Sequence, residues 1–309
     1  MLPFKVIYHP QYDLDLGPHV FPSQKFRLIH DALLAEGIAD AGDFLQPEPA
    51  PDEDILRVHT HAYVQKLRTD SLTLSERMKL EIPLTETSRE GFWLAAGGST
   101  LAGRKALEDG FAANLSGGFH HAYPGHGEGF CMIHDVAVAI RTLQAEGKIR
   151  TAMTVDTDVH HGNGTAAIFA SDPTVYTLSI HQENNYPEPK PPSDEDIGLE
   201  DGVRDEEYMD ALEEGLVRAL RKMTPDLILY VGGADPYRED QLGGLALTMD
   251  GLQKRDRLVF EHARRAGIPV ATTLAGGYAR RVADTVRIHT NTIIAARDVA
   301  LQLSAKGNG

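Results

Sequence analysis

The stretch that decides the fold of this chain is residues 151–164, TAMTVDTDVHHGNG. Its first five residues form an apolar run that is typical of a buried strand. Two aspartates and two histidines follow, and the glycines after them allow the backbone to turn sharply. In an open α/β sheet, ligands bind beyond the carboxyl ends of the strands. The stretch therefore predicts an α/β fold with a functional site at the end of this strand.

The spacing within this stretch sorts its polar side chains into two sets. Successive side chains of a strand point to opposite faces, so Asp156, Asp158 and His160 share one side and His161 points away. An aspartate and a histidine two residues apart can bind one metal ion. A lone Asp-x-His is usually structural, but so many polar groups after a buried strand would cost several kcal/mol if they stayed unpaired. We therefore interpret the stretch as a site.

The composition is that of an ordinary soluble globular protein, and it argues against two kinds of partner. Hydrophobic residues make up 42% and charged residues 24% of the 309 residues, and the formal net charge is −15. Nucleic-acid binding needs a basic surface, so we expect no nucleic acid. No apolar run approaches the ~20 residues that span a bilayer, so we expect no membrane partner. The single cysteine, Cys131, and the absence of an apolar signal core favour a cytoplasmic location and leave the oligomeric state open.

Strand and helix patterns alternate along the chain. Apolar runs predict strands at residues 4–8, 112–115, 151–155, 175–180, 227–231 and 268–274. Amphipathic patterns predict helices at residues 24–35, with Ser23 as cap, and at 89–108, 135–145, 206–223, 252–266 and 281–303. Residues 182–205 are polar, contain four prolines and predict a functional rim loop. This alternation predicts one α/β domain over residues 1–309, with a single open, mostly parallel sheet and helices on both faces.

Three further polar clusters follow predicted strands and carry flanking glycines. They are GGFHHA at residues 117–122, GGAD at residues 232–235 and GGY at residues 276–278. Each alone is weak evidence, since such a turn is common and an aspartate after a strand often caps a helix. Parallel strands, however, would bring all of these clusters and residues 156–164 to one edge of the sheet.

The chemistry of the four clusters predicts a catalytic metal centre. Asp158, His160 and Asp235 offer three ligands and leave positions open, as catalytic zinc sites do. The mixed oxygen and nitrogen set would also accept Fe²⁺ or Co²⁺. His120 and His121 can act as bases toward a water molecule.

Three other side chains complete this predicted centre. Asp156 can hold one imidazole in its tautomer, and Asn163 can do so more weakly for the other. The hydroxyl of Tyr278 can stabilise a developing oxyanion.

With these motifs, the chain resembles the zinc-dependent histone deacetylase family, which has the arginase/deacetylase fold. The motifs lie at residues 117–122, 129–131 (GFC), 156–164, 233–235 and 276–278, and the resemblance extends from Val6 to about Val299. Residues 58–63 and 243–245 are more similar to the class IV branch and its bacterial relatives than to class I.

The resemblance implies a role for each residue of the predicted centre. Asp158, His160 and Asp235 would bind zinc, and Tyr278 would polarise the acyl carbonyl.

For the two histidines, the resemblance implies separate partners. His120 would pair with Asp156, and His121 would pair with Asn163.

The resemblance also implies a tunnel for the acylated lysine and sites for structural monovalent cations. The tunnel residues would be Gly129, Phe130, Tyr186, Leu242, Gly276 and Gly277. One K⁺ or Na⁺ would lie among oxygens of Asp156, Asp158, His160, Ser179 and Ile180, and a second would lie near Phe169, Asp172 and Val175.

Two departures from the class I pattern affect the expected chemistry. Asn163 stands where class I members have an aspartate, which would make the imidazole of His121 less basic. The acidic loop residue that grips the substrate backbone in class I members has no clear match around residues 79–83.

The leading hypothesis is a zinc-dependent amide hydrolase that removes an acetyl or longer acyl group from a lysine side chain of a protein or peptide. An acetylpolyamine amidohydrolase is the alternative, favoured by the acidic run at residues 194–196 and the net charge. An arginase would need a two-metal cluster with more aspartates. A non-catalytic acyl-lysine binding module would have lost a ligand or the tyrosine, and none is missing.

Overall fold

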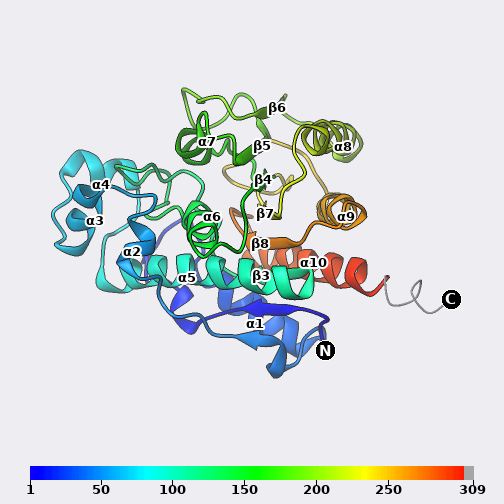
Figure 1. Ribbon diagram of the computed structural model, residues 1–309, viewed down its shortest axis with the longest axis horizontal. Helices are drawn as coiled ribbons and strands as arrows, with labels where there is room; N and C mark the ends of the chain where they lie inside the picture. Colours follow the sequence, from blue (N-terminus) through cyan, green and yellow to red (C-terminus); the bar gives the residue numbers. More distant parts are fainter. Residues whose placement is uncertain (303–309) are drawn as a thin grey trace.

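One eight-stranded sheet organises the fold, which a computed structural model describes over residues 1–302. The strands lie in the order β2-β1-β3-β8-β7-β4-β5-β6, and all neighbours in it are parallel (Figure 1). The strands are β1 (Lys5–Ile7), β2 (Phe44–Leu45), β3 (Phe111–Asn114), β4 (Ala152–Asp156), β5 (Val175–Gln182), β6 (Glu195–Leu199), β7 (Leu227–Gly232) and β8 (Val270–Leu274).

Helices cover both faces of this sheet. The α-helices are α1 (Lys25–Ala35), α2 (Asp52–Ile55), α3 (His61–Arg68), α4 (Leu74–Leu80), α5 (Glu86–Asp109), α6 (Asp135–Ala145), α7 (Asn163–Phe169), α8 (Asp205–Lys222), α9 (Met249–Arg265) and α10 (Val282–Leu301). Short 3₁₀ turns lie at Pro10–Tyr12 and Ala41–Asp43. Helices α5 and α6 pack together on one face, and α1, α8, α9 and α10 cover the other. Within the described residues, no helix has both the length and the apolar character needed to cross a membrane.

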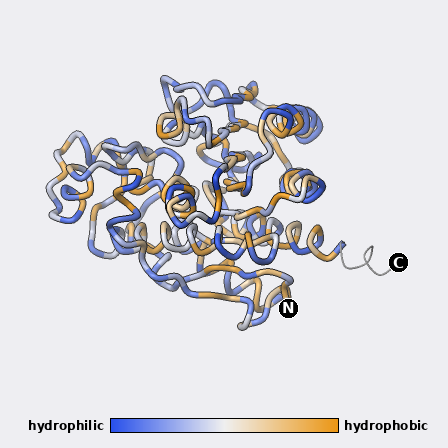
Figure 2. The backbone as a smooth tube through the Cα atoms, viewed as in Figure 1, coloured by the Kyte–Doolittle hydropathy of each residue, from blue (hydrophilic) through white to orange (hydrophobic). Residues whose placement is uncertain are grey.

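Strand β7 shows why a continuous apolar run suits this architecture. Leu227, Leu229 and Val231 belong to the core shared with α5 and α6. The alternate residues Ile228 and Tyr230 belong to the core on the opposite face. A strand of a parallel sheet is buried on both faces and needs apolar side chains at every position. Helices α8 and α9, in contrast, have one buried face, and hydrophobic and hydrophilic stretches alternate along them (Figure 2).

The predicted fold class is confirmed, and the sheet is wholly parallel among the described residues. The predicted strands and longer helices all occur, and their ends shift by only a few residues. The predicted C-terminal helix limit at residue 303 and the last part of the predicted domain, 303–309, lie outside the described residues. The elements β2, α2, α4 and α7 were not predicted, because they are too short to establish a periodic pattern.

Two local predictions were wrong. Ser23 does not cap α1: the helix begins after Gln24, and the Ser23 hydroxyl donates to the carbonyl of Leu14 instead. Residues 182–205 are not one rim loop, because Glu195–Leu199 forms β6 and pairs with β5 at the edge of the sheet. Backbone groups make the hydrogen bonds between β5 and β6, so the pairing does not require apolar side chains. The polar sequence of this segment therefore did not indicate a strand.

The strand order decides where the four polar clusters meet. Strands β3, β8, β7 and β4 are consecutive neighbours in the middle of the sheet, although β3 and β4 are far from β7 and β8 in sequence. Because all four are parallel, the turns after them lie side by side at one edge. The clusters that follow these strands in the sequence therefore face one another.

A buried arginine of α9 holds two of these turns together. The guanidinium of Arg255 donates to the carbonyl oxygens of Thr157 and Gly233, at 3.2 and 2.7 Å. It also pairs with Asp256 at 2.7 Å, and both side chains are fully buried. Asp256 in turn accepts the hydroxyl of Tyr230 at 2.5 Å. The turn after β4 and the turn after β7 thus share one cationic support.

We expect Arg255→Met to destabilise the protein by about 3–5 kcal/mol, because it leaves a buried carboxylate without its cationic partner. Urea-induced unfolding followed by circular dichroism measures this loss. Arg257→Met is the matched control on the same helix. Arg257 pairs with Glu261 near the surface, so this change should cost less than about 1 kcal/mol. Equal losses in the two variants would contradict the supporting role of Arg255.

Candidate active site

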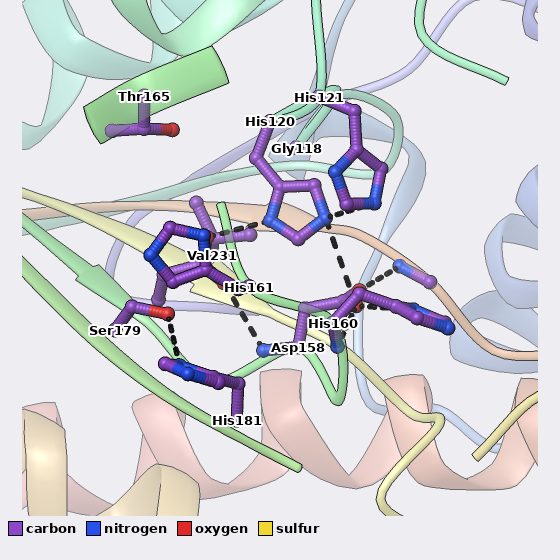
Figure 3. Close-up of polar contacts among 12 residues, drawn as sticks. Gly118, His120, His121, Asp158, His160, His161, Thr165, Ser179, His181 and Val231 are labelled. Atoms are coloured by element: carbon purple, nitrogen blue, oxygen red, sulfur yellow. Dashed lines mark hydrogen bonds and ion pairs between the residues drawn. The ribbon is translucent and has the colours of Figure 1, made fainter. Parts of the chain in front are cut away.

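The turn after β3 presents two adjacent histidines. It begins with Gly117 and Gly118, whose φ angles of 92° and 74° lie in the left-handed region that favours glycine. The buried carboxylate of Asp135 accepts the backbone N–H groups of Gly118 and Phe119, at 3.1 and 2.8 Å. Held in this way, the turn directs the next residue, His120, into the site (Figure 3).

The two histidines have different partners. Nδ1 of His120 lies 2.6 Å from a carboxylate oxygen of Asp156, at the end of β4. Nδ1 of His121 lies 2.7 Å from the amide oxygen of Asn163, at the start of α7. Their Nε2 atoms are 3.1 Å apart. The structure therefore brings together both pairs that the resemblance implied.

These surroundings push the two imidazoles toward opposite charge states. Burial alone lowers the pKa of His120, but the carboxylates of Asp156 and Asp158 outweigh it and raise this pKa to about 9. Burial, His120 and His160 lower the pKa of His121 well below its usual range. These surroundings thus favour the charged form of His120 and the neutral form of His121.

Three groups with metal-ligating chemistry converge beside these histidines. The carboxylates of Asp158 and Asp235 and the imidazole of His160 have ligand atoms within 4.8 Å of one another, and all three residues are buried. Nδ1 of His160 lies 3.1 Å from Asp158 and 3.6 Å from Asp235. They come from the turns after β4 and β7, as the sequence predicted.

Several features of this group fit a bound cation. Oδ2 of Asp235 is buried and has no hydrogen-bond partner. Burial and the neighbouring Asp158 raise the pKa of Asp235. A Cβ atom on Gly276 would lie 1.9 Å from Asp235 and 2.4 Å from Asp158, so only glycine leaves space there. Two carboxylates and one imidazole suit a divalent ion such as Zn²⁺ and leave positions free for other ligands.

Two cavities open onto this group. The outer cavity has a volume of about 220 Å³ and is lined by Glu81, His121, Gly129, Phe130, His160, Asn185, Tyr186, Leu242 and Tyr278. The inner cavity has a volume of about 30 Å³, is lined by residues that include His120, Asp158 and Gly276, and shares Tyr278 with the outer one. Tyr278 thus forms a wall next to the candidate metal group.

Most of the predicted tunnel residues meet around these cavities. Gly129, Phe130, Tyr186 and Leu242 line the outer cavity, and Gly276 lines the inner one. Phe130 has a φ of 67°, and such strain in a non-glycine residue is often kept at functional sites.

Gly277 does not line either cavity. Its φ is 146°, and a Cβ atom there would lie 2.8 Å from Ala234 and from Thr285, so this glycine allows the turn to pack closely behind the site. Its prediction as a tunnel residue was wrong for this reason.

An acidic residue at the mouth was missed in the sequence. Glu81 follows α4 with a φ of 61° and lines the outer cavity. Its backbone oxygen lies 2.9 Å from Nε2 of His19, whose ring packs edge-on against Phe130. The stretch around residues 79–83 therefore does place a carboxylate at the mouth. The left-handed backbone of Glu81 and its contact with the distant His19 place it at the mouth, and neither feature can be recognised in the sequence.

Two other charged residues near the centre were also missed. A carboxylate oxygen of Asp240 accepts the backbone N–H of Tyr278 at 2.6 Å, and the other accepts those of Leu242 and Gly243. Lys25 of α1 is fully buried and donates to the carbonyl of Ala275. Burial lowers the pKa of Lys25 to about 8. These contacts join parts of the chain too far apart for motif reasoning.

The residues of the predicted monovalent-cation sites lie in two places. Ser179 is the register partner of Asp156, which brings β5 beside the turn that carries Asp158. Phe169 ends α7 and Val175 begins β5, with Asp172 between them. The backbone oxygens of Phe169 and Asp172 accept the N–H groups of Asp172 and Val175. Both cation sites stay predictions.

A second group of histidines lies behind the centre. His161 points away from the candidate metal group, as its parity predicted, and its Nε2 lies 3.2 Å from Asp196 of β6. His181 lies beside it, with Nδ1 at 3.0 Å from the Ser179 hydroxyl (Figure 3). The hydrogen bond from His161 to Asp196 ties the β4 turn to β6 at the edge of the sheet.

The acidic run at residues 194–196 belongs to this edge and not to the cavity mouth. Asp194 accepts the N–H of Thr177 at 2.8 Å, and Glu195 pairs with Arg218 of α8 at 2.7 Å. These carboxylates are engaged in holding β6, so this run gives no support to a cationic substrate.

Comparison with known proteins identifies the class to which this fold and site belong. The model of the histone deacetylase domain matches residues 19–293. An uncharacterized protein of Picosynechococcus sp. is 42% identical over 298 residues, 96% of this chain and 99% of that protein. Histone deacetylase 2 of Arabidopsis thaliana is 30% identical, over 91% of this chain and 77% of that protein. A solved structure of an HDAC homologue complexed with SAHA has a TM-score of 0.80 at 26% identity, over 96% of this chain and 84% of that chain.

The chain therefore belongs to the histone deacetylase family, and its fold is the arginase/deacetylase fold. This membership supports an amide hydrolase activity of the deacetylase type. Enzymes of the family generally use a metal ion.

We expect Asp235→Ala to lose most of its bound divalent metal, because three ligands leave no redundancy. Metal analysis of the protein purified after zinc loading gives the stoichiometry. Asp194→Ala is the control, since this carboxylate is also hydrogen-bonded but belongs to the sheet edge. If Asp235→Ala retained full occupancy, Asp235 would not be a ligand.

Proposed function

We propose that this protein is a zinc-dependent deacylase that removes an acetyl or longer acyl group from a lysine side chain of a protein or peptide. The observation that carries the proposal is the convergence of Asp158, His160 and Asp235 with the His120–His121 pair at the inner end of a cavity. An outer cavity of about 220 Å³ adjoins a smaller inner one of about 30 Å³, and Tyr278 lines both, which suits an extended acylated chain.

The metal would be held by Asp158, His160 and Asp235. When bound there, it would supply a Lewis acid for the acyl carbonyl and lower the pKa of a water molecule. In the proposed reaction, Nδ1 of His121 keeps its proton because it donates to the oxygen of Asn163. Nε2 of His121, which carries no proton, takes one from the attacking water as the water oxygen bonds to the acyl carbon. His120, protonated beside Asp156, keeps a positive charge in the site.

The remaining steps use the same residues. The hydroxyl of Tyr278 donates to the carbonyl oxygen as negative charge develops on it. The C–N bond then breaks, and the proton held at Nε2 of His121 passes to the leaving amine nitrogen. The rings of Phe130 and Tyr186 would flank the aliphatic part of the lysine side chain, since both line the outer cavity.

The experiment that tests the proposal compares substrates on one purified, zinc-loaded preparation. Acetyl-lysine peptides, longer acyl-lysine peptides and acetylated polyamines form the panel. We expect hydrolysis of acyl-lysine peptides that a chelator abolishes and added zinc restores. No hydrolysis of any substrate under these conditions would overturn the proposal.

An acetylpolyamine amidohydrolase remains the second candidate, and one observation favours it. Glu81 places a carboxylate at the mouth, where a distal ammonium group of a polyamine would meet it. Glu81→Gln distinguishes the two candidates: it should raise KM for acetylated polyamines about tenfold, the value of one charge-assisted contact of roughly 1.4 kcal/mol, and leave a neutral acyl-lysine peptide nearly unaffected.

Tyr278→Phe should lower kcat by about 10²–10³-fold, the usual cost of one oxyanion donor. It removes one hydroxyl and little volume, so the unfolding temperature and metal content should stay at the wild-type values. Tyr237→Phe, at a buried tyrosine outside both cavities, is the matched control and should retain activity. Near-normal turnover of Tyr278→Phe would exclude the assigned role.

A further inference from the structure

The amide of Asn163 is held from its far side by a carboxylate. Nδ2 of Asn163 donates to Oε1 of Glu128 at 2.8 Å, while Oδ1 of Asn163 faces Nδ1 of His121 at 2.7 Å. The same oxygen of Glu128 accepts the hydroxyl of Tyr186 at 2.8 Å. Glu128 thus joins the partner of His121 to a wall of the outer cavity.

The surroundings of Glu128 keep it ionised. Its side chain is 16% exposed, with Lys79 at 3.7 Å and His126 at 3.2 Å. Burial raises its pKa, but hydrogen bonds from His126, Tyr186 and Asn163 outweigh this and lower it to about 2. An ionised carboxylate only accepts hydrogen bonds, so the group of Asn163 that faces it must be the NH₂.

This contact matters because an amide, unlike a carboxylate, has two different ends. With its oxygen toward His121, Asn163 accepts a hydrogen bond from Nδ1–H, and Nε2 of the ring then carries no proton. Turned over, the amide would donate to Nδ1, and the proton of the neutral ring would move to Nε2. The ring could then no longer take a proton there. Two groups outside the His121–Asn163 pair bear on this choice: His120, whose Nε2 lies 3.1 Å from Nε2 of His121, and Glu128, which accepts from the NH₂ end of the amide.

We propose that Glu128 is a positioning residue that fixes the orientation of the Asn163 amide, and thereby the tautomer of His121. This inference rests on the proposed function, in which Nε2 of His121 takes the proton of the attacking water. Glu128 supplies a negative charge that reaches His121 only through Asn163, in a hydrogen-bonded relay Glu128–Asn163–His121. Through the Tyr186 hydroxyl it also ties this relay to the wall beside the substrate.

The arrangement reverses a simple expectation for Asn163→Asp. The side chains are nearly isosteric, but the new carboxylate would face Glu128 across the 2.8 Å that now separates an amide nitrogen from an oxygen. Two carboxylates at this distance repel each other. The double variant Asn163→Asp/Glu128→Gln exchanges the two groups: the new amide at residue 128 can donate to the new carboxylate at residue 163, which still accepts from His121.

The test is a double-mutant cycle on the zinc-loaded protein at mildly alkaline pH, where two carboxyls do not share a proton. We expect Asn163→Asp to lower kcat about 10–100-fold, the usual cost of disturbing an outer partner. Adding Glu128→Gln to it should restore kcat to within a few fold of the wild type. If the losses of the two single variants simply multiply in the double variant, the groups act independently and the proposal is wrong.

Glu195→Gln controls for the chemical change itself, because Glu195 is 17% exposed and hydrogen-bonded to Arg218 away from the cavities. It should leave kcat unchanged, alone or combined with Asn163→Asp. Unfolding temperatures of all variants separate a loss of kcat from a loss of folded protein. Rescue of Asn163→Asp by Glu195→Gln as well as by Glu128→Gln would overturn the specific pairing.

A second measurement does not depend on activity. In the metal-free, ¹⁵N-labelled protein, long-range ¹H–¹⁵N spectra report which ring nitrogen of each histidine carries the proton, and His121→Gln identifies the signals of His121. We expect the Nδ1–H tautomer in the wild type and its partial loss in Glu128→Met, which removes the acceptor at similar volume. An unchanged tautomer in Glu128→Met would overturn the inference. If the wild type hydrolysed no substrate, the proposed function would fail, but this spectrum would still decide the role of Glu128.

Discussion

Two carboxylates buried side by side are the constraint on which this site depends. Asp158 and Asp235 lie close together because β4 and β7 are neighbours in a parallel sheet, so the turns that follow them leave the sheet side by side at the same edge. Burying two negative charges without compensation is costly. The surroundings supply part of the compensation: backbone N–H groups donate to both side chains, and Gly276 leaves open space against them. A metal ion, which enzymes of the family generally use, would supply the rest if it bound between Asp158, His160 and Asp235.

The chain treats its two central histidines unequally, and this inequality has a geometric source. Both lie on one turn and nearly touch, yet one reaches back to β4 and the other reaches forward to α7. The carboxylate of the first partner favours an imidazolium, whereas burial and the neighbouring imidazoles keep the second ring uncharged beside its neutral amide partner. Two adjacent histidines thereby differ in their favoured charge state because the groups around the two rings differ.

Further support comes from contacts made outside the reacting groups. Arg255 fastens the β4 and β7 turns from below, and Asp240 fixes the backbone of Tyr278. Glu128 holds the partner of His121 from the side of the cavity. Each contact uses one charged group to satisfy several backbone or side-chain partners, which keeps a polar site ordered inside an apolar fold.

The sequence by itself determined the sheet, its parallel sense and the clusters at the strand ends, because apolar periodicity and glycine-flanked polar turns are local signals. From residues 151–164 and three similar turns, it also predicted which side chains would gather, since strands of one direction end at one edge. Only the tertiary structure decided the rest. No local sequence pattern predicted four features: strand β6, the position of Glu81 at the cavity mouth, the packing role of Gly277 and the support that Arg255 gives to two turns. Glu128 is 35 residues from Asn163 and 58 from Tyr186, so their contact depends on how distant loops fold over the sheet.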